Sequence, residues 1–220
     1  MAGMKIMLTG CSGVGKTTLA RWISEYLCLP FISGSYSDLV PETKSQPHSN
    51  MITKDPKLIF EQDNLVINKR HKLFSNKLHF VSDRSYFDSA AYLIQKLAHQ
   101  IKECDTDHFI SCCERLMSEE CTHLIFIPFT KDFLYNWEME DNSKRVLNRY
   151  YQFEVSQILY GILDLWNFKP NWIRSKFLPG KSIRGTITCN GKKIETLILD
   201  EMDFQLRTEI VRKFLSKYSL

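Results

Sequence analysis

The sequence contains no apolar run that approaches the roughly 18 residues needed to span a membrane. Its first ten residues, MAGMKIMLTG, also lack the basic region and following apolar stretch of a secretory signal peptide. We therefore expect no membrane partner. The expected location is the cytoplasm, or the host cytoplasm if a phage encodes the protein.

An excess of one charge sign is nearly missing as well, since the formal net charge is +4 over 220 residues. This mild excess excludes a histone-like polycation but suits a protein whose ligands are anionic. The seven cysteines are odd in number and none of them has C-x₂-C spacing. We therefore expect free thiols in a reducing compartment and no zinc site.

Short apolar runs alternate with longer amphipathic segments along the chain, a pattern typical of α/β proteins. Strands are predicted at 5–9, 29–32, 78–81 and 122–128, and helices at 16–27, 55–76, 88–103, 107–119, 143–166 and 203–216. Residues 185–200 are predicted to form a hairpin around Asn190-Gly191, and 33–54 and 130–143 to form loops. The fold expected for a single domain over 1–220 is a three-layer P-loop fold. Its sheet is mostly parallel with helices on both faces, followed by a C-terminal hairpin and helix.

The first predicted turn carries the clearest motif. Residues 10–17, GCSGVGKT, match G-x-x-x-x-G-K-[ST] at every position, between an apolar strand and a helix. In this motif, glycines let backbone N–H groups surround phosphate oxygens, and the helix directs its positive end at the same anion. Lys16 is expected to reach the β- and γ-phosphates, and Thr17 to ligate Mg²⁺. ATP is thus expected to contact Gly10, Cys11, Ser12, Gly13, Val14, Gly15, Lys16, Thr17 and Thr18.

A second acidic element must decide which class of P-loop protein this is, and the sequence offers two. Asp83 and Arg84 follow the strand predicted at 78–81; Asp83 can hold Mg²⁺ or act as a base, and Arg84 can grip a phosphoryl group. Asp200 and Glu201 follow a later apolar run and resemble the element of P-loop ATPases in which the glutamate activates water. The first reading predicts a kinase. The second predicts an ATPase that couples hydrolysis to a partner.

The two motifs GCSGVGKTT and VSDRSYFDSAAY together resemble the thymidylate kinase and deoxynucleoside kinase group. The form D-R-S-x-x-D-x-x-A-Y is also similar to small phage-type P-loop kinases, AAA-like ATP-binding proteins that include kinases of hydroxymethyluracil in DNA. The resemblance covers residues 4–165. It implies an ATP- and Mg²⁺-dependent kinase with Asp83 and Arg84 at the transfer site. It also implies a basic lid, for which Lys144, Arg145 and Arg149 are the candidates.

The acceptor is less closely determined by the sequence. In related kinases the helix before the Asp83 strand helps to hold the acceptor, and here that helix carries Glu61, Gln62 and Arg70. Gln62 can pair with a base edge and Arg70 with a phosphate. A free nucleoside, a monophosphate and a base within DNA remain open as acceptors. The oligomeric state, a homodimer included, is open as well.

Residues 166–194 contain no Asp or Glu. The segment interleaves seven Lys and Arg residues with Trp166, Phe168, Trp172 and Phe177. Basic groups beside stacking surfaces are typical of proteins that bind single-stranded or flipped-out bases, so this segment can contact DNA. The alternative is a hairpin whose aromatic residues lie in the core and whose charges are solvated.

Overall fold

The most apolar runs of the sequence form the middle of a seven-stranded sheet. The computed structural model describes residues 3–40, 55–130, 148–171 and 181–216. The strands follow the order β2-β3-β1-β4-β7-β6-β5, where β1 is Lys5–Thr9, β2 Phe31–Ile32, β3 Phe80–Ser82, β4 His123–Phe126, β5 Lys169–Pro170, β6 Ile183–Cys189 and β7 Lys192–Ile198. The first five strands in this order run parallel; β6 runs antiparallel to β7, and β5 runs antiparallel to β6. The predicted mostly parallel sheet is therefore confirmed.

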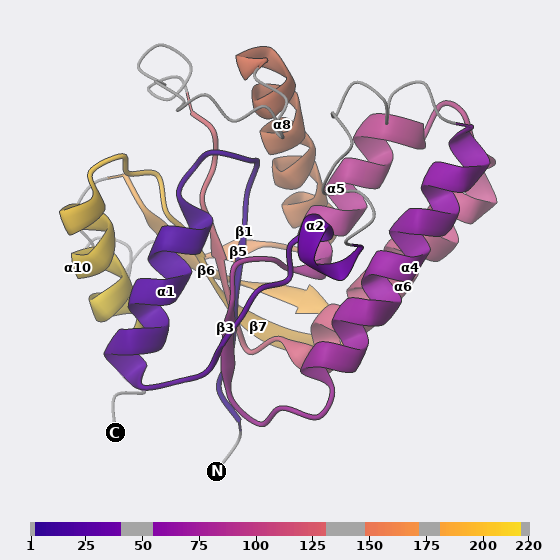
Figure 1. Ribbon diagram of the computed structural model, residues 1–220. Coiled ribbons are helices and arrows are strands. Elements are labelled where there is room, and N and C mark those ends of the chain that lie inside the picture. Colours follow the sequence, from indigo (N-terminus) through magenta and orange to yellow (C-terminus); the bar gives the residue numbers. More distant parts are fainter. Residues whose placement is uncertain (1–2, 41–54, 131–147, 172–180, 217–220) are drawn as a thin grey trace.

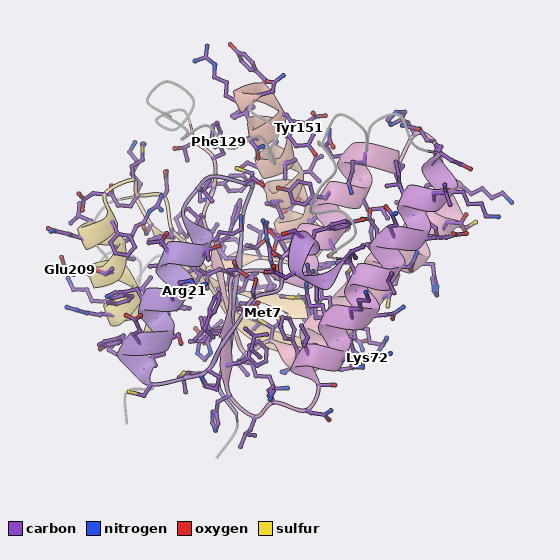
Figure 2. The ribbon with its side chains drawn as sticks, in the orientation of Figure 1. Met7, Arg21, Lys72, Phe129, Tyr151 and Glu209 are labelled. Carbon is purple, nitrogen blue, oxygen red and sulfur yellow. The ribbon has the colours of Figure 1, made fainter. Side chains whose placement is uncertain are left out.

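Helices cover both faces of the sheet, as predicted (Figure 1). On one side lie α1 (Lys16–Leu27) and α10 (Phe204–Leu215); on the other lie α4 (Pro56–Phe74), α5 (Tyr86–Leu97), α6 (Glu103–Glu120) and α8 (Arg149–Leu165). The strands β1 and β4 lie in the core, with Ile6, Met7, Leu124 and Ile125 fully shielded from solvent. In Figure 2, Met7 accordingly lies at the centre of the molecule. No helix of the described residues is long and apolar enough to cross a membrane.

The helix predicted at 88–103 is wrong at both ends. Helix α5 begins at Tyr86 because Ser85 and Asp88 form a capping box: the Ser85 side chain accepts from the Asp88 N–H, and the Asp88 carboxylate accepts from the Ser85 N–H. It ends at Leu97, and a separate helix begins at Glu103. The loop predicted at 33–54 contains the short helix α2 (Tyr36–Leu39), which Ser35 caps; residues 41–54 lie outside the described part of the chain.

The predicted hairpin is confirmed, and its second strand also completes the parallel sheet. The turn residues Asn190 and Gly191 have φ angles of 45° and 78°, as a two-residue turn with both central residues left-handed requires. Strand β7 pairs with β6 on one side and with β4 on the other. The C-terminal part of the chain is therefore built into the central sheet, directly beside β4.

Two glycine substitutions separate backbone strain from side-chain crowding. A Cβ added at Gly191 or at Gly161 meets no atom within 4 Å, but only Gly191 has a positive φ. We expect Gly191→Ala to lower the free energy of unfolding by about 1 kcal/mol, because an L-residue is strained in the left-handed region. Gly161→Ala, in the middle of α8, should raise it by up to about 1 kcal/mol. Urea unfolding of both variants measures the two changes, and equal signs would contradict this account.

Candidate functional site

The loop between β1 and α1 has the backbone that phosphate binding requires. Gly10, Gly13 and Gly15 all have positive φ angles, of 146°, 89° and 86°. At Gly10 an added Cβ would lie 2.4 Å from the Ile127 carbonyl oxygen, so a residue larger than glycine does not fit at this position. Helix α1 then begins at Lys16, with its N-terminus directed at the loop.

The Lys16 side chain folds back over its own loop. Its Nζ donates hydrogen bonds to the carbonyl oxygens of Gly10 (2.6 Å) and Cys11 (2.5 Å), and only 5% of the residue is exposed. Burial, and to a smaller extent the positive charge of Arg84, lower the pKa of the Lys16 ammonium to about 7. The side chain is thus held inside the loop and is poised to gain a proton when an anion arrives.

Thr17 and Asp83, which the sequence assigned to the metal, meet in the structure. The Thr17 hydroxyl donates to Asp83 Oδ2 at 2.6 Å, and Asp83 Oδ1 accepts the Gly34 N–H at 3.2 Å. The contact exists because β1 and β3 are parallel neighbours whose carboxyl ends open onto the same edge of the sheet.

These two oxygens fit a Mg²⁺ site. Mg²⁺ prefers oxygen ligands at 2.0–2.1 Å in an octahedron, whose adjacent ligands lie about 2.9 Å apart, and it is commonly held by one or two protein groups plus phosphates. Thr17 Oγ1 and Asp83 Oδ2 are spaced close to that edge length. In the described part of the chain, no group of three or more His, Cys, Asp or Glu residues could hold a metal by itself. Phosphate oxygens and water usually complete the coordination of a Mg²⁺ that is held by one or two protein groups.

Arg84 lies beside Asp88, a residue to which the sequence analysis assigned no role. Asp88 is buried; its Oδ1 accepts the Gly10 N–H at 3.2 Å, and its Oδ2 accepts the Ser85 N–H at 2.8 Å. Arg84 Nη1 is 3.7 Å from Asp88 Oδ1, and 22% of the Arg84 side chain is exposed. Asp88 thus connects the phosphate loop to the Asp83–Ser85 turn. The Ser85-x-x-Asp88 capping pattern is the sequence signal that could have revealed it.

Arg70, a predicted acceptor ligand, is buried behind this turn. Its Nη1 donates to the Ser85 carbonyl and the Ser89 hydroxyl, both at 2.7 Å, and its Nη2 donates to the Gly34 carbonyl at 2.9 Å. Gly34 is tightly enclosed as well, since an added Cβ would lie 2.9 Å from Arg84 Cβ. Arg70 and Gly34 together hold the backbone around Asp83. No motif in the sequence indicated this role of Arg70 and Gly34.

The other predicted acceptor residues lie on the same helix, α4. Glu61 is exposed, whereas Gln62 is half-buried and its Oε1 accepts the hydroxyl of Tyr36 at 3.2 Å. The next residue, Asp63, is buried and pairs with Lys96 of α5 at 3.2 Å. Helices α2, α4 and α5 therefore share a polar cluster beside the Asp83 turn.

Of the predicted lid residues, only Arg149 falls within the described part of the chain. Arg149 is exposed at the first turn of α8, with its guanidinium 5.4 Å from the Tyr150 ring. Lys144 and Arg145 lie outside the described residues. The same helix makes a contact that the sequence analysis missed: Gln152, which is 1% exposed, accepts the Ser12 N–H at 3.0 Å through its Oε1.

Glu201, the glutamate of the second acidic element, makes local contacts. The Glu201 carboxylate accepts the N–H groups of Met202 (2.8 Å) and Asp203 (3.0 Å), and Asp203 caps α10 by accepting the Leu206 N–H. These contacts order the turn between β7 and α10. They direct the Glu201 carboxylate to its own backbone.

The described parts of the acid-free segment divide between core and surface. Trp166 is 2% exposed and packs edge-on against Phe87, with ring centroids 4.9 Å apart. Arg184 is also buried and lies 3.3 Å from Glu195. The exposed basic residues of the described segment are Lys169, Lys181, Lys192 and Lys193. Trp172 and Phe177 lie outside the described residues.

Replacing Arg70 distinguishes a positioning role from a phosphate ligand. We expect Arg70→Met to lower the free energy of unfolding by about 3 kcal/mol or more, because it leaves the Gly34 and Ser85 carbonyls buried without their charged donor. Lys72→Ala is the control, since Figure 2 shows Lys72 on the outer side of the same helix. Denaturant unfolding measures both. Unchanged stability, with only acceptor binding weakened, would instead support the phosphate-ligand role.

Comparisons with known proteins agree with this geometry at the level of the fold. No curated protein matches the sequence. Among solved structures, deoxyadenosine kinase from M. mycoides with bound dCTP superposes with a TM-score of 0.63 at 12% identity, over 97% of this chain and 100% of that one. Thymidylate kinase from Candida albicans gives 0.58 at 15% identity, over 99% and 93%. NadR protein in complex with NAD and AMP-PNP gives 0.58 at 12% identity, over 100% and 50%.

The expected resemblance to the P-loop nucleotide kinase group is therefore confirmed for the fold. The model of one protein family, described as an AAA domain, matches residues 5–163. These residues include the phosphate loop, the Asp83 turn and most of α8. Because the match extends over more than half of the sequence, the chain belongs to this AAA domain family.

Proposed function

We propose that the protein is an ATP- and Mg²⁺-dependent phosphotransferase that acts on a nucleoside or nucleotide-type acceptor. The observation that carries the proposal is the meeting of the phosphate loop with the Asp83–Arg84 turn, shown by the 2.6 Å contact between Thr17 and Asp83. The phosphate loop, which would hold the phosphoryl donor ATP, thus lies beside the Asp83–Arg84 turn at one edge of the sheet. The fold shared with deoxyadenosine and thymidylate kinases supports this assignment.

On the donor side, backbone N–H groups of the loop bind the phosphates of ATP, and the Lys16 ammonium moves from the Gly10 and Cys11 carbonyls to the β- and γ-phosphates. Thr17 and Asp83 would supply oxygen ligands for Mg²⁺. The metal, when bound, neutralises charge on the transferring group. Since Asp83 already accepts two hydrogen bonds, its position favours holding the metal over acting as a base.

Arg84 is the group best placed to follow the phosphoryl group as it moves. Its guanidinium is partly exposed and is held near Asp88. The planar fork is thus oriented by Asp88 and keeps N–H groups that can bind a phosphoryl group. A cation in this position stabilises charge that develops during transfer. Arg149, exposed at the first turn of α8, would add to this charge. Arg145, the other arginine predicted for the lid, lies outside the described residues.

On the acceptor side, we assign recognition to the α4 surface beside the Asp83 turn. The Gln62 amide, held by Tyr36, can pair with the polar edge of a base, and Glu61 is exposed nearby. A more specific alternative for the acceptor is a hydroxymethyl base within DNA. The exposed Lys169, Lys181, Lys192 and Lys193 favour it, whereas the burial of Trp166 and Arg184 weighs against it.

The alternative of an ATPase that couples hydrolysis to a partner rests on Glu201. A glutamate that activates water needs a carboxylate free to face the γ-phosphate. Here that carboxylate accepts two N–H groups of its own turn. The contact supports the kinase over the hydrolase.

Labelled ATP incubated with a panel of nucleosides, monophosphates and hydroxymethyl-base DNA tests the proposal. We expect label on an acceptor, and we expect Lys16→Ala and Asp83→Asn to lower the transfer rate at least about a hundredfold. Glu201→Gln should stay within a few-fold of the wild type, because Glu201 orders only the turn before α10. Free phosphate as the sole product, with Glu201→Gln nearly inactive, would establish the hydrolase instead. The labelled acceptor also separates free nucleosides from DNA.

The buried ammonium predicts a pH effect on ATP binding. Above pH 7 Lys16 is largely neutral in the free protein, and the phosphates of ATP raise its pKa again; binding at pH 8.5 should therefore take up about one proton. ATP affinity should weaken as pH rises above 7, by up to about tenfold per pH unit. Calorimetry in buffers of different ionisation enthalpy measures the uptake. Lys16→Arg is the control that should show none, and a buffer-independent enthalpy for the wild type would refute the shift.

A further inference from the structure

The C-terminal helix reaches the phosphate loop through one arginine. Arg207 lies in the first turns of α10, is 4% exposed, and donates from Nη1 to the Val14 carbonyl at 2.7 Å. Its Nε donates to the Glu201 carbonyl at 2.5 Å. One guanidinium thus joins the loop after β1 to the turn after β7, two segments that are far apart in sequence.

The site around Arg207 is built to hold this side chain. Asp203 caps α10, the helix that carries Arg207. The Glu201 carboxylate orders the turn before α10, and the Glu201 carbonyl in this turn accepts the Arg207 Nε–H. On the loop side, a Cβ added at Gly15 would lie 3.0 Å from Arg207 Nη1. The absence of a side chain at Gly15 is therefore what allows the guanidinium to approach the loop. Burial lowers the pKa of Arg207 to about 10, which still leaves it charged at neutral pH.

The contact determines how one peptide unit of the loop is oriented. The Val14 carbonyl and the Gly15 N–H belong to the same planar trans peptide, so they point in opposite directions. A donor that holds the carbonyl outward therefore directs the N–H inward, to the side on which phosphate is bound. The positively charged Arg207 guanidinium, by donating to the Val14 carbonyl, also strengthens the Gly15 N–H as a donor, because hydrogen bonds in a chain polarise one another.

We propose that Arg207 is a positioning residue for ATP: by binding the Val14 carbonyl it orients the Gly15 N–H toward the phosphates. This inference rests on the proposed ATP-binding function. It adds the C-terminal helix to the donor site, from a position 193 residues along the chain from Val14. Lysine can replace the charge, but it lacks the planar fork that bonds two carbonyls in different directions.

ATP and ADP binding to Arg207→Lys and Arg207→Ala tests the proposal. We expect the dissociation constants for both nucleotides to rise about 10- to 100-fold in Arg207→Ala, the loss of a charge-assisted hydrogen bond to the loop. The rise should be smaller in Arg207→Lys. The KM for the acceptor should stay unchanged, since the acceptor does not contact this peptide.

Arg212→Ala is the matched control. Arg212 also joins α10 to α1, but by stacking on Trp22 and Tyr26, at 5.3 Å and 5.4 Å from their ring centroids. It should leave ATP affinity unaltered. If Arg207 only stabilises the fold, its variants will lose thermal stability while the folded protein binds ATP as tightly as the wild type, and the inference is wrong. Should Arg207→Ala fail to fold, Arg207→Lys decides alone. A wild type that binds no ATP would defeat the proposed function itself.

Discussion

Parallel pairing of β1 with β3 brings the two halves of the site together, because the carboxyl ends of parallel neighbours open on one edge of the sheet. Lys5 pairs with Phe80 and Met7 with Ser82, and this register brings the end of β3 to within two residues of the end of β1. Thr17 and Asp83 can therefore share a hydrogen bond although 66 positions separate them. A one-residue slip would turn the side chains of β3 to the opposite faces of the sheet and remove Asp83 from the phosphate loop.

Charge around that edge is arranged in alternating signs within a poorly hydrated space. Lys16, Asp83 and Asp88 are each at most 5% exposed, and Arg84 is the cation that retains the most contact with solvent. Opposite charges in such surroundings stabilise one another, whereas an unpartnered ion would be costly. Because Lys16 loses part of its charge through burial, the site is prepared for an anion without being strongly positive beforehand.

Hydrogen bonds from buried charged side chains to backbone groups hold the loops of the site in place. Arg70 holds the Gly34 and Ser85 carbonyls, Asp88 holds the Gly10 N–H, and Arg207 holds the Val14 carbonyl. Each of these buried charged side chains fixes a loop from behind. Loops held this way keep their N–H groups directed at a ligand without paying the ordering cost at the moment of binding.

Local pattern in the sequence determined the strand–turn–helix of the phosphate loop, the Asn190-Gly191 hairpin and the placement of Asp83 at a strand end. Each of these follows from a short run of residues whose backbone preferences agree with their periodicity. The roles of Arg70, Asp88, Gln152 and Arg207 were decided only by the tertiary structure. Their partners are backbone atoms of distant loops, and every residue offers the same N–H and C=O whatever its side chain. Sequence can therefore show that such an arginine exists, but only the folded chain selects the carbonyl it will hold.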